Sequence, residues 1–428
     1  MSPRFLLYGI GGTYNYGCEA IVRGTERLLH EVWPDAVVRY ASSRPNDDAR
    51  RLQGCNVDII PRLPLPGLFI RKVVRRLAAH ADLEWVPPLE DTRFAEDCDI
   101  VLLIGGDLYT ATTDGRQYNR SLLRFGEFVH ASGRPVVLWG ASVGPFERLC
   151  VRERFRNHFE TNISLVTCRE PDTVRYMREL NCKVNSVPCA DPAFALVSEQ
   201  SASTSPIRKA RIGINLSPLS VLQRGQSSLR ASLLQQARVI NHLSATLDAD
   251  IVLIPHVMCD FRAGDDDLRY LESLYAALSV STRKHTDLLT DDAGFLGRRE
   301  QLRHCDLVIA ARMHCAINAV SAGVPTVFLA YSRKAEGMAE YIYGTRSYLL
   351  DLSAFTEKSA THLAGQMLAG HSSIRRQLLL RLPKLRAEAR SGAMAVKKVL
   401  GKTGGIGEDV FTLQNGPIDI ASESISFP

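Results

Sequence analysis

The strongest constraint on the fold is an alternation of short apolar runs with helix-like stretches along the 428-residue chain. Each apolar run ends in glycine or in a polar loop, as in Phe5–Ile10, Asp99–Gly106 and Pro135–Ala141. Such runs are typical of parallel strands that helices cover on both faces. The sequence therefore predicts an α/β fold.

A serine-rich stretch, Val197–Ile207, interrupts the alternation and is the clearest domain boundary. The alternation restarts at Arg211. We predict an N-terminal Rossmann-like domain over residues 1–200, on the acceptor side, and a C-terminal Rossmann-like domain with closing helices over 207–400. A Gly- and Ser-rich tail, 401–428, is expected to be disordered. The two domains are expected to face a cleft.

The composition excludes several classes of protein. The formal net charge is only +6 and the aromatic content is 7%, with no motif of stacking aromatic residues, so we do not expect nucleic-acid binding. The ten cysteines form no CxxC pair and no zinc-type cluster, and we expect no metal site. Without a signal peptide or an apolar run long enough to span a bilayer, a cytoplasmic protein with reduced thiols is expected.

The segment 306–337 concentrates the chemically useful side chains. The apolar run Leu307–Ala310 ends in Arg312 and His314, and a second apolar run is followed by Arg333 and Lys334. In parallel sheets, ligands collect at the carboxyl ends of the strands. Guanidinium groups, an ammonium and an imidazole at one such edge suit a small dianion that must also exchange a proton.

A glycine-rich turn, residues 9–20, links the first strand to the first helix. Backbone N–H groups at such a helix start can bind an anion or a sugar hydroxyl. The turn matches neither the dinucleotide-binding nor the phosphate-loop pattern, and its glycines could serve only a tight turn. Asn15 and Glu19 favour a ligand-binding role, because each could hold a polar ligand.

Two further elements of the first half have a structural and a functional interpretation. Gly105 and Gly106 would let a ligand or another backbone come close, and Asp107 could bind hydroxyl groups or cap a turn. Arg169 could pair with Glu170 on the surface or extend into the inter-domain cleft. The sequence does not decide between these alternatives.

In the second half, Asn215 and His256 each follow a strand that is expected to face the cleft. Both are candidate ligand contacts. For His256, which follows a proline, a purely structural role is an equal alternative. His314 differs, because a histidine two residues beyond Arg312 at a strand end is hard to bury without partners, and a site role is favoured.

Residues 68–77 place Leu68, Phe69 and neighbouring apolar residues beside four basic residues. This pattern predicts a short basic amphipathic helix that could rest on anionic lipid at the inner membrane face. The alternative is a helix packed on the domain surface with its arginines in solvent.

The chain resembles the polysaccharide pyruvyl transferases over about residues 4–345. The resemblance is carried by an ordered set of segments: GGTYNYGCEAI, DIVLLIGGD, WGASVGP, CREPDTVRYMREL, ADPAF, GINLS, LIPH and ARMHCAINAVSAGVPTVFLAYSRKAEG. The resemblance implies a two-domain, glycosyltransferase-B-like fold. It also implies transfer of a pyruvyl group from phosphoenolpyruvate, the donor substrate, to a sugar of a glycan or lipid-linked glycan, usually as a cyclic ketal and without a further cofactor.

The resemblance assigns roles to several residues. His314 would be the acid/base, Arg312 and Arg169 would hold the phosphate and the carboxylate, and Lys334 would add charge to the same pocket. The chain departs from the family pattern at Asp107, where a glycine is common, and at Ala311, where a serine is frequent.

Two other functions are compatible with the sequence. A nucleotide-sugar-dependent glycosyltransferase would share the two-domain fold and would need an acidic residue to hold the nucleotide, for which Glu336 or Glu340 could serve. A non-enzymatic scaffold is the other alternative, although the presence of Arg312 and His314 argues against it.

Overall fold

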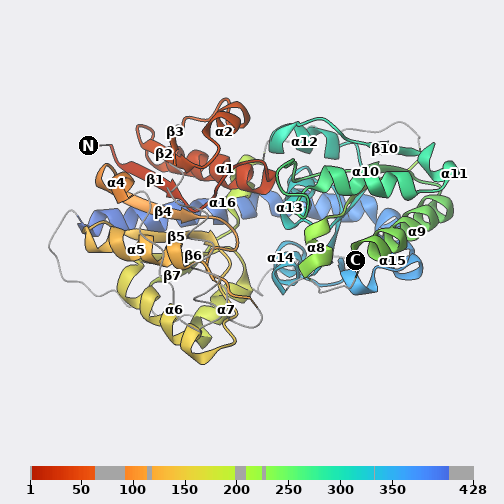
Figure 1. Ribbon diagram of the computed structural model, residues 1–428. Coiled ribbons are helices and arrows are strands. Elements are labelled where there is room, and N and C mark those ends of the chain that lie inside the picture. Colours follow the sequence, from red (N-terminus) through yellow and green to blue (C-terminus); the bar gives the residue numbers. More distant parts are fainter. Residues whose placement is uncertain are drawn as a thin grey trace. The chain divides into compact units, whose positions relative to one another are not determined.

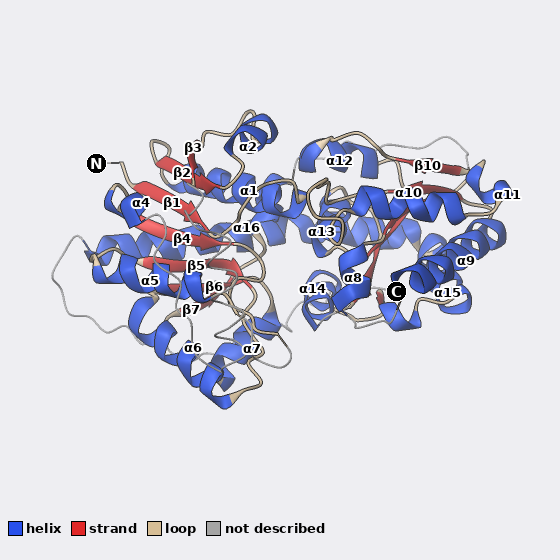
Figure 2. Ribbon diagram, viewed as in Figure 1, coloured by secondary structure: helices blue, strands red, loops and turns tan. Residues whose placement is uncertain are grey.

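The computed structural model describes residues 2–62, 92–112, 118–197, 209–223, 228–331 and 333–403. These residues form two compact units, each built around its own parallel sheet (Figure 1). Helices cover both faces of the strands in each unit (Figure 2). The predicted basic helix at 68–77, nearly all of the predicted linker, and the tail from 404 onward lie outside the described residues.

Unit 1 contains a seven-stranded sheet in the order β3-β2-β1-β4-β5-β6-β7, and every neighbouring pair is parallel. The central strand β4 consists of five apolar residues, all buried, because helices cover it on both sides. The strands are β1 (Arg4–Tyr8), β2 (Val37–Ser42), β3 (Asp58–Pro61), β4 (Ile100–Ile104), β5 (Val136–Ala141), β6 (Leu165–Cys168) and β7 (Ser186–Pro188).

Helices connect these strands and bury apolar faces against the sheet. In α5, for example, Leu122, Leu123, Phe125 and Val129 are buried, and Asn119 caps the start of the helix. The described helices of the first half of the chain are α1 (Tyr16–Val32), α2 (Pro45–Arg51), α4 (Thr92–Glu96), α5 (Arg120–Ala131), α6 (Leu149–Asn162) and α7 (Pro171–Glu179).

Unit 2 contains a six-stranded sheet in the order β10-β9-β8-β11-β12-β13, again all parallel. The first strand lies in the middle and the order reverses beside it, which is the Rossmann arrangement; in such sheets ligands bind where the order reverses. The strands are β8 (Arg211–Asn215), β9 (Asp250–Leu253), β10 (Thr286–Leu288), β11 (Leu307–Ala310), β12 (Thr326–Ala330) and β13 (Leu349–Asp351).

The helices of the second half alternate with these strands. They are α8 (Pro218–Gln223), α9 (Leu229–Leu247), α10 (Asp267–Ala277), α11 (Val280–Arg283), α12 (Gly294–Leu302), α13 (Met313–Ser321), α14 (Arg333–Tyr343), α15 (Glu357–Ala369) and α16 (His371–Thr403), with short 3-10 turns at Pro192–Leu196 and Leu352–Ala354. Both units are thus parallel α/β structures, as the sequence predicts.

The limits of the units differ from the predicted domains at three segments, one of which is 193–197, where unit 2 begins before the predicted boundary at 200. Tyr14–Ala20 belongs to unit 2, because its backbone pairs with the loop after β9: the Tyr16 N–H donates to the carbonyl of His256 over 3.0 Å. The part of α16 from Glu388 belongs to unit 1, where Arg390 lies 3.7 Å from Glu31. Each of these segments thus belongs to the other unit than the one that the predicted boundaries at 200 and 400 assign to it.

Candidate active site

The carboxyl ends of β8, β9 and β11 bring Asn215, His256 and Arg312 together in unit 2. These strands are adjacent, with β8 between the other two. Arg312 follows β11 in an extended conformation and is the N-terminal flanking residue of α13, so that His314 lies in the first turn of that helix. Arg312 and His314, which the sequence predicts to lie close together at a strand end, therefore lie at the start of a helix. Backbone N–H groups and the helix dipole favour anions there.

Two carboxylates hold the guanidinium of Arg312. Its Nε and Nη2 donate to Oδ1 of Asp267 over 3.1 and 2.9 Å, and Nη2 also donates to Oδ1 of Asp265 over 2.7 Å. Burial would lower the pKa of Arg312, but these two carboxylates outweigh it and raise the pKa above its ordinary value. The side chain is 7% exposed and is therefore a fixed cation at the carboxyl edge of the sheet.

Asn215 positions this ion pair. Its Nδ2 donates to the carbonyl of Ile254 over 2.8 Å, and its Oδ1 accepts the backbone N–H of Arg312 over 2.8 Å. One amide side chain thus ties the ends of all three strands together. Asn215 is fully buried and positions the ends of these strands, and the predicted ligand contact stays a prediction.

His256 is likewise buried, with 1% of its surface exposed. Its Nε2 lies 3.4 Å from Nδ2 of Asn318, and its ring packs edge-on against Tyr16. Burial, and after it the neighbouring side chains of His314, Arg298 and Arg312, holds the pKa of His256 well below its usual value. The imidazole therefore contacts α13 through Asn318, and the ligand contact predicted for His256 stays a prediction.

His314 is half-buried, and the glycine loop lies directly against it. A Cβ atom added to Gly17 would lie 2.6 Å from the Cγ and Nδ1 atoms of the imidazole. Real Cβ atoms do not approach ring atoms so closely, so residue 17 must be a glycine while the imidazole keeps this position. The glycine loop therefore orients His314.

The remaining polar residues of the glycine loop serve its attachment. Oδ1 of Asn15 accepts the N–H of Gly17 over 2.9 Å, and its backbone forms an antiparallel bridge with Val257. A carboxylate oxygen of Glu19 accepts the N–H of Phe295 over 2.8 Å, at the start of α12. These hydrogen bonds attach the loop, and the ligand contacts predicted for Asn15 and Glu19 stay predictions.

In unit 1, Arg169 organises the carboxyl edge of the other sheet. Nε and Nη2 donate to Oγ of Ser142 over 3.0 and 2.9 Å, and Nη1 donates to Oδ2 of Asp191 over 2.9 Å. Burial opposes its charge, but Asp191, Glu170 and Asp107 raise the pKa of Arg169 above its ordinary value. With no exposed surface, Arg169 ties loops together and does not offer a face to an anion.

The glycines near Arg169 make room for it. A Cβ atom at Gly106 would lie 2.7 Å from Nη2 of Arg169, and the carbonyl of Gly106 accepts from the same nitrogen over 3.4 Å. Gly105 has a φ of +139°, a conformation that favours glycine. Asp107 lies 3.8 Å from Nη2 of Arg169, with 66% of its side chain exposed, and is the polar residue of this group that faces solvent.

The sequence reasoning missed Asp265 and Asp267, the partners of Arg312. The signal was the acidic run at residues 265–267 just before α10, since a buried arginine needs a carboxylate partner. The backbone of Lys334 lies in α14, but its side chain is outside the described residues. Among the described residues, no three His, Cys, Asp or Glu side chains gather as metal ligands, and no helix is long and apolar enough to cross a membrane.

These features define the class of the protein: an α/β fold of two Rossmann-type units, with a fixed cation and an imidazole at a helix start in unit 2. The sequence profile described as "Polysaccharide pyruvyl transferase" matches residues 15–333, well over half of the chain. The chain belongs to the polysaccharide pyruvyl transferase family, and it is accordingly a transferase. No curated protein matches the chain.

Solved structures with the same fold are distant in sequence. UDP-GlcNAc 2-epimerase from Neisseria meningitidis, bound to UDP-GlcNAc, has a TM-score of 0.58 at 10% identity, covering 93% of this chain and 99% of that one. HepE from Anabaena, in complex with UDP and glucose, has a TM-score of 0.55 at 12% identity, covering 94% and 100%. These similarities confirm the predicted glycosyltransferase-B-like fold.

Proposed function

We propose that the protein transfers a pyruvyl group from phosphoenolpyruvate to a pair of sugar hydroxyls of a polysaccharide or its precursor. The observation that supports this most is the pairing of the half-buried imidazole of His314 with the buried guanidinium of Arg312 at the start of α13. A fixed cation and a helix N-terminus suit the phosphate and carboxylate of the donor. A neighbouring histidine suits the proton transfers.

In this proposal His314 is the acid/base. It delivers a proton to the methylene carbon of phosphoenolpyruvate, and the adjacent carbon, now electron-poor, is attacked by the first sugar hydroxyl. Departure of inorganic phosphate regenerates the electron-poor carbon, and the second hydroxyl closes the ketal. One hydroxyl proton replaces the proton given to the methyl group, and the other leaves with phosphate. Each step needs a group that both gives and takes a proton near neutral pH.

The other predicted residues take supporting roles in the proposal. Arg312 and the first N–H groups of α13 hold the donor, with Lys334 as a further cation. Asn215 and His256 fix Arg312 and α13, and Arg169 fixes the loops of unit 1. Asp107, largely exposed at the end of β4, is the candidate contact to acceptor hydroxyls.

The first test is His314→Ala, assayed as phosphate release from phosphoenolpyruvate with a panel of sugar acceptors. We expect a loss of at least about a hundredfold in rate, the scale of general acid–base catalysis. His242→Ala, an exposed histidine on α9, is the matched control and should keep the full rate. An unchanged rate in His314→Ala would remove the acid/base assignment.

The alternative is a nucleotide-sugar-dependent glycosyltransferase, favoured by the nucleotides bound in the similar structures. The acidic residues available to it, Glu336 and Glu340, both lie near Arg346, at 3.5 and 2.8 Å. Thermal melting separates the two functions, because a ligand stabilises only a protein that binds it. A melting shift with phosphoenolpyruvate that is lost in Arg312→Lys favours pyruvyl transfer, whereas a shift with nucleotide sugars alone favours the alternative.

A further inference from the structure

The last helix, α16, is far more basic than the rest of the protein. It carries nine basic residues and one acidic residue, Glu388, so its formal charge is nine minus one, or +8, whereas the entire chain carries +6. The basic residues are Arg375, Arg376, Arg381, Lys384, Arg386, Arg390, Lys397, Lys398 and Lys402. The remainder of the chain is therefore slightly acidic, and the positive charge is concentrated on one helix.

The helix has a buried apolar face and an exposed mixed face. Ile374, Leu378, Leu382 and Leu385 recur at helical spacing and are at most 3% exposed. On the opposite side, in the part of α16 that belongs to unit 2, lie the exposed residues Arg376, Leu379, Leu380, Pro383, Lys384 and Ala387, which we call the α16 stripe. Leu380 is 61% exposed, although leucine is costly to leave in water.

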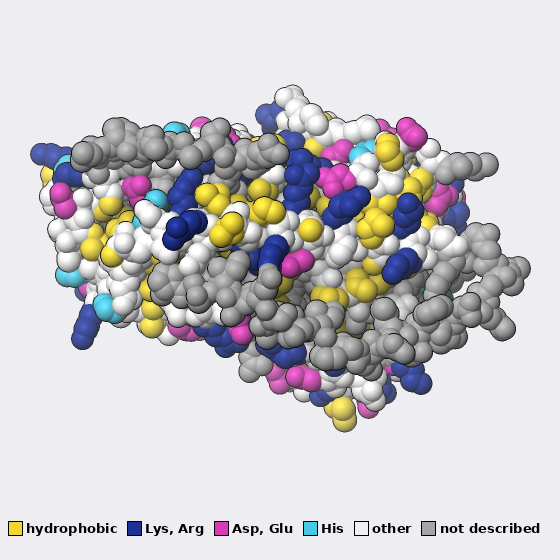
Figure 3. Space-filling view, turned by 180° about the vertical axis from the view of Figure 1, so that it is seen from behind, with side chains coloured by type: hydrophobic (Ala, Val, Ile, Leu, Met, Phe, Trp, Pro, Cys, Tyr) yellow, Lys and Arg dark blue, Asp and Glu magenta, His cyan; other side chains and the backbone are white. Residues whose placement is uncertain are grey.

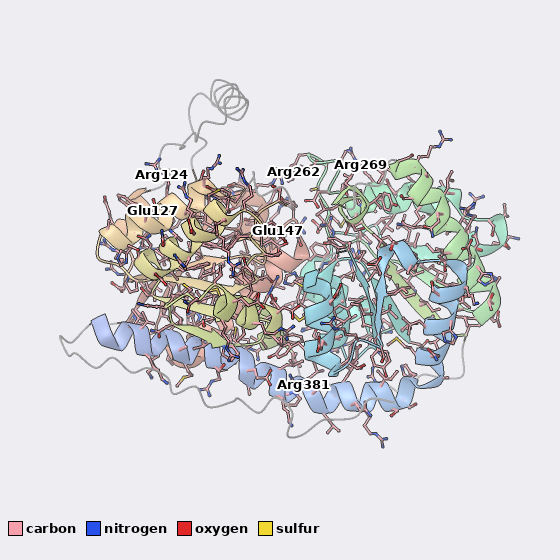
Figure 4. The ribbon with its side chains drawn as sticks, turned by 90° about the horizontal axis from the view of Figure 1, so that it is seen from below. Arg124, Glu127, Glu147, Arg262, Arg269 and Arg381 are labelled. Atoms are coloured by element: carbon pink, nitrogen blue, oxygen red, sulfur yellow. The ribbon has the colours of Figure 1, made fainter. Side chains whose placement is uncertain are left out.

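Two other arginines of the helix are used inside unit 2. Nη1 of Arg375 donates to the carbonyl of Gly323 over 2.9 Å, and Nη2 of Arg381 donates to the carbonyl of Tyr341 over 3.3 Å. Figure 4 labels Arg381 on α16. Arg375 and Arg381 thus anchor the helix, whereas Arg376 and Lys384 are exposed.

The same mixture continues on the part of α16 that belongs to unit 1. There Met394 is 42% exposed, and Lys397 and Lys398 are exposed as well. Figure 3 shows hydrophobic and basic side chains interspersed on the face of the molecule opposite to that seen in Figure 1. No acidic residue lies among the exposed residues of the helix between 372 and 398.

We propose that the α16 stripe is a docking surface for an anionic phospholipid membrane. Exposed leucines between lysines and arginines match the interface of a bilayer, because the apolar side chains enter the acyl boundary while the cations meet the headgroup phosphates. A nucleic acid would use the cations but would leave Leu379 and Leu380 in water. The inference goes beyond the proposed reaction and does not depend on it.

The experiment is flotation of the full-length protein with phosphatidylcholine vesicles, with and without phosphatidylglycerol. We expect binding to the anionic vesicles only, weakened by salt because charges supply much of the attraction. The test variant is R376Q/L380Q/K384Q, which changes exposed positions one helical turn apart. We expect its apparent affinity to fall at least about tenfold, on the scale of the free energy that each basic residue contributes at an anionic surface.

Helix α9 offers a closely matched control. Arg230, Leu234 and Arg238 have the same spacing and are also exposed, but α9 has no other lysine or arginine. R230Q/L234Q/R238Q should therefore bind as the unchanged protein does. The charge-conserving variant R376K/K384R should also bind, and the melting temperatures of all variants establish that each is folded.

Several results would overturn the proposal. These are the absence of binding to anionic vesicles, equal loss in the α9 and α16 variants, or unchanged binding in the α16 variant, which would move the contact elsewhere. A change of oligomeric state in R376Q/L380Q/K384Q without a change in vesicle binding would make the stripe a contact between copies of the chain. Stronger binding to a nucleic acid than to vesicles would likewise identify a different partner.

Discussion

Each unit buries an arginine at the carboxyl edge of its sheet, and the two arginines differ in position and in surroundings. Arg169 follows β6 and Arg312 follows β11, each at the carboxyl edge of a parallel sheet. Each guanidinium is buried and held by a buried carboxylate, Asp191 in unit 1 and Asp267 in unit 2. The two arginines are thus alike in residue type, burial and carboxylate partner, but not in position: β11 borders β8, the first strand of unit 2, whereas β4 and β5 lie between β6 and β1.

Their surroundings separate them. Arg169 has no exposed surface, and its nitrogens are engaged with Ser142, Asp191 and Gly106. Arg312 retains some exposure and precedes a helix whose first turn carries the half-buried His314. The comparison teaches that an arginine at a strand end indicates a site only when a second reactive group and an open helix start accompany it.

The largest effect should come from breaking the buried pair in unit 1. Arg169→Leu leaves the carboxylate of Asp191 buried and without its charge partner, and we expect a loss of about 3–5 kcal/mol in the free energy of unfolding. Urea denaturation measures this. The control is Arg175→Leu, which removes an exposed ion pair with Asp172 and should cost at most about 1 kcal/mol. Full stability combined with lost donor binding would instead make Arg169 a ligand contact.

The next effect concerns His256, which supports unit 2 only while it is neutral. In the folded protein the pKa of His256 lies well below its usual value. As the pH falls, His256 therefore binds a proton in the unfolded chain before it does so in the folded protein. Stability is therefore complete above the unfolded pKa of about 6.5 and decreases below it, by about 1.4 kcal/mol per pH unit, until the folded pKa is reached.

Urea denaturation at pH 7 and pH 5 tests this dependence. The unchanged protein should lose up to about 2 kcal/mol more than His256→Gln over this interval, since glutamine does not titrate. His242→Gln, at an exposed position, should keep the pH dependence of the unchanged protein. If all three proteins respond equally to pH, then His256 does not carry this linkage.

The central strands could be predicted from sequence because their environment leaves a clear pattern. Leu307–Ala310 and Thr326–Ala330 are the observed limits of β11 and β12, since strands buried on both faces are continuously apolar and end sharply at polar residues. The outer strands β3, β7, β10 and β13 are not anticipated from the sequence. They are short and only half-buried, so their residues carry no continuous apolar signal.

The sequence locates the site but does not assign a role to each of its residues. The sequence identifies Arg312, His314, Asn215 and His256 as residues that follow neighbouring strands, and the structure brings these four together in unit 2. A sequence pattern does not show which partners a side chain already has. Asp267 accepts hydrogen bonds from Arg312, and Asn318 lies beside His256. Both contacts depend on tertiary packing.

The smallest expected change in stability has the sharpest functional meaning. Gly17→Ala places a methyl group where the imidazole of His314 lies, at a cost of about 1–3 kcal/mol, of which better helix propensity returns up to about 1 kcal/mol. The net loss of stability should be about 1 kcal/mol, whereas displacement of an acid/base group should lower kcat about ten- to a hundredfold. The melting shift produced by phosphoenolpyruvate should persist, because Arg312 is untouched.

The control for this variant is Gly365→Ala in α15, where an added Cβ atom would meet Leu247 at an ordinary 3.5 Å and activity should not change. A double variant then asks whether Gly17 acts through His314. If it does, Gly17→Ala should cost nothing further in a His314→Ala background, since the two residues act as one unit. Additive losses would mean that the glycine loop contributes to the reaction by a route other than the imidazole. The difference between the two arginine sites would then depend on Arg312 and the start of α13 alone.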